Sequence, residues 1–85
     1  MDLYRHVPVW ARTPGGVVLY QCLELLGQGF TVQSKDYFHA GSIPAGIAHS
    51  QQQLVELLQE QAPEERSPLH PTLQQAIAAF ERDWS

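Results

Sequence analysis

Apolar and polar residues alternate along the first segment of the chain, from Leu3 to Arg12. One side holds Leu3, Val7, Val9 and Ala11. The other side holds Tyr4, His6, Pro8, Trp10 and Arg12. A period of two predicts a half-buried strand. Pro8 lacks a backbone N–H, so we expect this strand at an edge of its sheet.

Two further strands are predicted at Val17–Leu26 and Phe30–His39, joined through the sequence GQG as a hairpin. A two-residue turn at Gly27–Gln28 would pair Leu25 with Phe30. One face would then gather Val17, Leu19, Leu23, Leu25, Phe30, Val32 and Phe38. This register leaves a continuous apolar face on the hairpin.

Helical spacing replaces alternation in the second half of the chain. Residues 47–61 place Ile47, Leu54, Leu57 and Leu58 on one side, and Pro63 ends this helix. Thr72 and Gln75 form a capping box at the start of a final helix. Its apolar positions are Leu73, Ala76, Ile77, Phe80 and Trp84.

These elements predict an α+β fold of order β-β-β-α-α, in which residues 1–85 form a single domain. The strands make a small three-stranded antiparallel sheet. Both helices are expected on its one apolar face, which leaves the other face open.

Composition narrows the classes of function. The 85 residues include five basic and nine acidic ones, for a formal charge of −4, and the basic residues are scattered. Nucleic-acid binding requires clustered cations and is therefore disfavoured. No apolar run approaches the ~20 residues that cross a bilayer. The single cysteine, Cys22, has no internal disulfide partner, which favours a reducing cytoplasm.

The stretch QSKDYFHAG brings Asp36, Tyr37 and His39 close together in the sequence. Neighbouring residues on a strand point to opposite faces, so Asp36 and Tyr37 are not expected to converge on one reacting atom. We predict no catalytic site here. Asp36 points inward in this register and needs a partner, for which Arg66 or an amide at a helix start are the candidates.

No pattern for metal or cofactor binding is found. The chain has no CxxC or HxxxH spacing, and its glycines do not form a phosphate-binding loop. Cys22 is interpreted as a small, half-buried apolar residue on a strand. We therefore expect no metal and no cofactor.

The sheet face opposite the helices carries the candidate partner-binding residues. They are Tyr4, Trp10, Tyr20, Cys22, Lys35 and Tyr37. Exposed aromatic patches often mark interaction sites, so this face is the predicted binding surface.

Two stretches resemble a family of small bacterial proteins that has no known activity. LYQCLELLGQGFTVQSKDYFH matches its strand with Tyr, Cys and Glu, its glycine turn and its Val-Gln-Ser strand. QAPEERSPLHPTLQQAIAAFERDW matches its capped C-terminal helix. Together they cover about half of the chain, and they imply a bacterial origin but no functional residues.

The function expected from the sequence is a non-enzymatic protein-interaction module: an adaptor, a regulatory subunit or a neutralising partner. Self-association is included in this hypothesis. The alternative is a small enzyme or ligand-binding protein with a cleft between sheet and helices. A weaker alternative is single-stranded nucleic-acid binding, with Tyr20 and Tyr37 stacking on bases.

Overall fold

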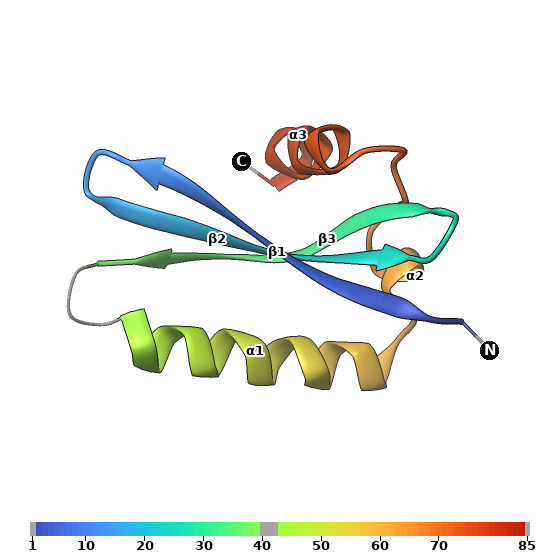
Figure 1. The fold of residues 1–85 in the computed structure, drawn as a ribbon, viewed down its shortest axis with the longest axis horizontal. Coiled ribbons are helices and arrows are strands. Elements are labelled where there is room, and N and C mark those ends of the chain that lie inside the picture. Colours follow the sequence, from blue (N-terminus) through green and yellow to red (C-terminus); the bar gives the residue numbers. More distant parts are fainter. Residues whose placement is uncertain (1, 40–42, 85) are drawn as a thin grey trace.

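The computed structural model describes residues 2–39 and 43–84, and the side chains of residues 2–39 and 48–83. In this part of the chain, three strands are followed by three helices (Figure 1). The strands are β1 (Tyr4–Thr13), β2 (Gly16–Leu25) and β3 (Gly29–Phe38). The helices are α1 (Ile43–Glu60), α2 (Pro63–Arg66) and α3 (Leu73–Trp84). The sheet is antiparallel with order β1-β2-β3, so the predicted α+β fold is confirmed.

The hairpin between β1 and β2 turns at Pro14 and Gly15, where Thr13 pairs with Gly16. Glycine is needed at position 16 because a Cβ there would lie 2.3 Å from the backbone oxygen of Phe38. Strand β1 lies at a sheet edge, as its proline predicted.

The hairpin between β2 and β3 differs from its predicted register. Leu25 pairs with Gly29 across a turn of residues 26–28, so the two-residue turn is wrong. A bulge at Gln33 adds one unpaired residue to β3. Beyond the bulge the pairing returns to the predicted one, and Val17 faces Phe38.

The bulge reverses the predicted face of the first part of β3. Phe30 and Val32 lie on the face opposite to the one expected, because they precede the extra residue. Phe30 also exchanges two backbone hydrogen bonds of 2.8 Å with His70. Gly29 permits this close approach, since a Cβ there would lie 2.9 Å from the His70 backbone oxygen.

The two long helices cover opposite faces of the sheet, which corrects the prediction that both pack on one face (Figure 1). Tyr20 points to one face, where its hydroxyl donates a hydrogen bond to Glu81 of α3. The next residue, Gln21, points to the other face and donates to Ser50 of α1 over 2.9 Å. Adjacent residues of a strand face opposite ways, so α3 and α1 must lie on opposite sides.

Strand β2 explains this arrangement. Its residues from Val18 to Leu23 are all buried. A strand that is covered on both faces carries apolar residues on both, and the run VVLYQCL has this character. The physical signal for two covered faces was therefore present in the sequence.

The capped start of α3 is confirmed. The Thr72 hydroxyl oxygen accepts a hydrogen bond of 3.1 Å from the backbone N–H of Gln75. The core beneath α3 consists of Val18, Tyr20, Cys22, Val32 and Ala76.

The side of α1 that faces the sheet is narrower than predicted. Leu54 is buried and Leu57 is half-buried, but Leu58 remains exposed. The predicted inward positions of Ile47 and Trp84 lie outside the described side chains.

Candidate functional site

The predicted open aromatic face is not formed. Tyr20 and Cys22 are buried beneath α3, and Tyr20 is only 8% exposed. Tyr4 and Trp10 lie on the opposite face, because they pair directly with Leu25 and Leu19 of β2. The prediction of one shared surface is therefore wrong: its residues are divided between the two sides of the sheet.

Lys35 and Tyr37 do share the face of Tyr20, at the edge of α3. Lys35 Nζ lies 2.7 Å from Glu81 Oε1, and 5.8 Å and 5.3 Å from the ring centroids of Tyr20 and Tyr37. The hydrogen bond from Lys35, followed by that from Tyr20, lowers the pKa of Glu81. The same pairing raises the pKa of Lys35 to about 12. These contacts attach α3 to β3.

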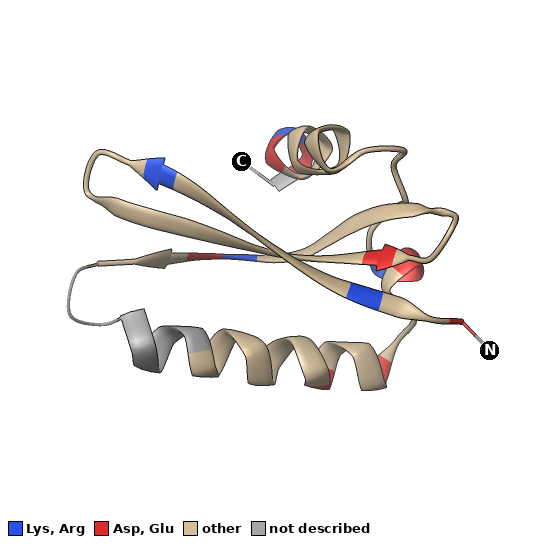
Figure 2. Cartoon of the chain, viewed as in Figure 1, with Lys and Arg blue, Asp and Glu red and all other residues tan. Residues whose placement is uncertain are grey.

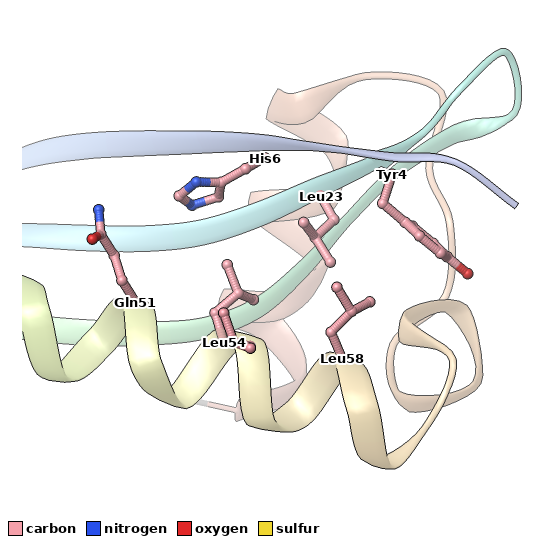
Figure 3. A pocket seen from close by; sticks show the side chains of 7 residues that line it. Tyr4, His6, Leu23, Gln51, Leu54 and Leu58 are labelled. Carbon is pink, nitrogen blue, oxygen red and sulfur yellow. The ribbon is translucent and has the colours of Figure 1, made fainter.

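A groove between β1 and α1 is one concave feature of the described residues. We call it the β1–α1 groove; its volume is about 380 Å³ (Figure 3). The residues that line it are Tyr4, His6, Leu23, Gln51, Leu54, Val55 and Leu58. Helix α1 makes its main contacts with β2 and β3, so the side of β1 facing the groove is left uncovered.

A chain of polar side chains lies beside the groove. His6 Nε2 donates to Gln21 Oε1, because the amide nitrogen of Gln21 already donates to Ser50. The Ser50 hydroxyl donates in turn to Asp36 over 2.7 Å. All three hydrogen bonds thus run in one direction, from His6 at the surface to the Asp36 carboxylate.

This chain settles the partner of Asp36, which is Ser50 and neither of the two candidates expected from the sequence. It also fixes the orientation of the His6 ring in the groove. With Nε2 bonded to Gln21, a neutral His6 presents Nδ1 as an acceptor. His6, Gln51 and the hydroxyl of Tyr4 are the polar groups of the lining, and the other lining side chains are apolar.

One end of the groove is acidic. The Tyr4 hydroxyl donates a 2.7 Å hydrogen bond to Glu64 of α2. This bond, then burial, and then the charges of Glu64, Asp2 and Glu65 raise the pKa of Tyr4 to about 12. Figure 2 shows acidic positions of α2 and of the N-terminal segment at this end of the molecule.

The acid and the phenol of the QSKDYFHAG stretch do not converge on one point. Asp36 pairs with Leu19 and Tyr37 with Val18, so the two side chains point to opposite faces, as predicted. Burial raises the pKa of the Cys22 thiol to about 12, which opposes a nucleophilic role. Among the described residues, no group of three His, Cys, Asp or Glu side chains is placed to hold a metal ion.

His6, Val55 and Leu58 line the groove but were not among the predicted site residues. Gln21 was the available signal, since a glutamine inside an apolar strand requires a buried polar partner. Val55 was a second signal, because it extends the apolar side of α1 beyond the part that faces the sheet.

Comparison with known proteins adds no assignment. No family model, curated protein or solved structure matches the chain. The resemblance to small bacterial proteins therefore stays a prediction.

Proposed function

We propose that this chain is a non-enzymatic protein-interaction module, acting as an adaptor, a regulatory subunit or a neutralising partner. Its partner binds in the β1–α1 groove and not on the face of Tyr20. The observation that carries the proposal is the apolar groove beside the face of β1 that α1 leaves exposed. Val55 is 55% exposed and Leu58 is 39% exposed along its wall.

Leaving these apolar side chains in water costs free energy. Burial of apolar surface stabilises a protein or complex by about 25 cal/mol for every Å² removed from water. Single exposed apolar residues are ordinary, but a contiguous set around a groove typically marks an interaction site. Trp10 lies on the same sheet face, further along β1, and is 47% exposed. It extends the surface that a protein partner would bury.

A small-molecule ligand is the second candidate. The volume of the groove lies within the range of ~300–1,000 Å³ typical of ligand pockets. The groove offers His6 and Gln51 as polar groups to orient such a ligand. Nucleic-acid stacking through Tyr20 has less support, because its ring is buried beneath α3.

The proposal includes a cytoplasmic location in a bacterial cell. The free thiol of Cys22 fits a reducing compartment. Across the described residues, no helix is both long enough and apolar enough to cross a membrane.

Site-specific photocrosslinking in the source organism tests the proposal. A photoreactive phenylalanine analogue replaces Val55 in one variant and Gln53, on another side of α1, in the matched control. We expect a discrete crosslinked protein from position 55 and none from position 53. Equal crosslinking at both positions, or none at position 55, would contradict the proposal.

A further inference from the structure

We propose that the element bound in the β1–α1 groove is an amphipathic helix of another protein, with a basic residue at the end that lies beside Tyr4. This inference rests on the proposed function and specifies its partner. The helical shape of the partner follows from the geometry of α1 and β1, and its basic residue follows from the acidic end of the groove.

The wall of the groove has the geometry of a helix-packing surface. Gln51, Val55 and Leu58 have the spacing i, i+4, i+7, and Leu54 lies between them. Residues at this spacing lie on one face of a helix, and the ridges of such a face pack into the grooves of a neighbouring helix. A second helix parallel or antiparallel to α1 would therefore pack against this wall.

The width of the sheet also indicates that a second helix fits beside α1. Strands lie about 4.8 Å apart, and a helix with its side chains is about 10 Å wide, so one helix covers about two strands. Helix α1 covers β2 and β3. The remaining strand, β1, requires a second helix on this face, and the chain supplies α3 to the opposite face instead.

An added strand fits less well. The backbone N–H of Leu26 donates to the Leu3 carbonyl over 3.1 Å, so the backbone polar groups of Leu3 point toward β2. Along a strand these groups alternate in direction, so the backbone groups of Tyr4, His6 and Pro8 point toward the free edge of the sheet. Pro8 has no N–H to donate there, and proline at this position protects a sheet edge from strand addition.

The charge of the partner follows from Asp2, Glu64 and Glu65. Among the described residues, none of these three forms an ion pair with a lysine, arginine or histidine. All three act on the Tyr4 hydroxyl at the end of the groove. A lysine or arginine of the bound helix would neutralise this negative charge.

A second copy of the chain is a poorer occupant. Each copy has a formal charge of −4. The exposed side of α1 offers glutamine and glutamate rather than basic residues. Pairing two copies through α1 would leave the acidic ends uncompensated, whereas a basic helix from another protein compensates them.

The test uses a phage-displayed library of 16-residue peptides on a helix-favouring Ala-Gln background. The positions of one helical face are randomised among apolar residues, and each end position is Lys, Glu or Gln. Selection is made on the whole protein with the Val55→Asp variant as competitor. The affinity of a selected peptide is then measured on purified variants by titration.

We expect selected peptides with lysine enriched at one end. Val55→Asp should weaken binding by at least about tenfold, because it places a charge on an apolar contact. The matched control Gln53→Asp, exposed on another side of α1, should change affinity by less than about twofold. Asp2→Asn combined with Glu65→Gln should weaken binding about threefold and reduce its dependence on salt.

Three results would overturn the inference. They are no enrichment over the Val55→Asp competitor, enrichment of glutamate at both ends, or concentration-dependent self-association that Val55→Asp abolishes. The crosslinking experiment separates this failure from that of the proposed function. A crosslink at position 55 without any selected helical peptide would support the interaction module and contradict the helical partner.

Discussion

Gln21 is the polar residue that connects the elements around the α1 face. It lies fully buried on β2, accepts a hydrogen bond from His6 of β1 and donates one to Ser50 of α1. Ser50 extends the connection to Asp36 of β3. Because an unpaired buried polar group is costly, any sliding of α1 along the sheet would break this chain. We infer that it fixes the position of α1.

Replacing Ser50 with alanine tests this role. The change removes the acceptor for Gln21 and the donor for Asp36, so both are left with an unmet hydrogen bond. We expect the free energy of unfolding, measured with urea, to fall by about 1–3 kcal/mol. Gln53→Ala, on an exposed part of the same helix, should change it by less than about 0.5 kcal/mol. Equal effects from the two variants would contradict a structural role for the chain.

Cys22 is expected to be chemically inert in the folded protein. Burial raises its pKa to about 12, and its side chain is not exposed. At pH 8 the thiolate population is then about a thousandfold below that of an unfolded thiol. Iodoacetamide should therefore modify Cys22 in denaturant and leave the native protein unmodified over the same time. Rapid native modification would show that α3 opens readily from the sheet.

At the scale of an element, the start of α3 depends on its cap. Thr72→Ala removes the acceptor for the Gln75 backbone N–H and should lower the free energy of unfolding by about 0.5–2 kcal/mol. Thr72→Ser retains the hydroxyl and should restore most of this loss. Chemical denaturation of both variants makes the measurement. If serine behaves like alanine, the methyl group of Thr72 matters and its hydroxyl does not.

The attachment of α3 to the sheet should depend on pH through Glu81. Hydrogen bonds from Lys35 and Tyr20 lower the pKa of Glu81 below its ordinary value of 4.5. A lowered folded-state pKa contributes stability that is present above 4.5 and is lost as the pH falls through the folded value. Urea unfolding between pH 6 and 3 should therefore show decreasing stability.

Glu81→Gln is the matched variant for this prediction, since it keeps an acceptor for Tyr20 but cannot ionise. Its unfolding free energy should vary less with pH over the same range. Parallel curves for the two proteins would show that Glu81 does not supply this pH dependence.

At the scale of the whole molecule, the sheet separates two layers that differ in chemistry. Figure 1 shows α3 on one side and α1 on the other. Both layers bury apolar side chains, with Tyr20 and Val32 under α3 and Leu19 and Leu54 on the α1 side. The α1 layer also holds the polar chain and the β1–α1 groove, so it combines a part of the core with a free surface.

The two tyrosines of the predicted interaction face now have different expected effects. Tyr20 is buried under α3, so Tyr20→Ser should cost about 3–5 kcal/mol of unfolding free energy. Tyr37 is 65% exposed, and Tyr37→Ser should cost less than about 1 kcal/mol. Thermal and urea unfolding of the single variants distinguish them. Similar losses would contradict the covered position of Tyr20.

Local patterns in the sequence determined the elements of this protein. The alternation around Pro8 indicated an edge strand, and Thr72 with Gln75 marked the start of α3. The same patterns placed the three strands and the hairpin around Gly27, but not the register of that hairpin. These features depend on residues close together in the chain, whose backbone geometry and hydrogen bonds fix one another. They could therefore be predicted without knowledge of the fold.

Only the tertiary structure decided which segment covers each face, and with it the location of the candidate site. Alternation shows that the faces of β2 differ, but it does not show what packs on them. Tyr20 meets Glu81 across 61 positions, and Gln21 meets Ser50 across 29. Such contacts form when whole elements pack, so the bulge at Gln33, the choice of helix for each face of the sheet and the β1–α1 groove were decided by packing.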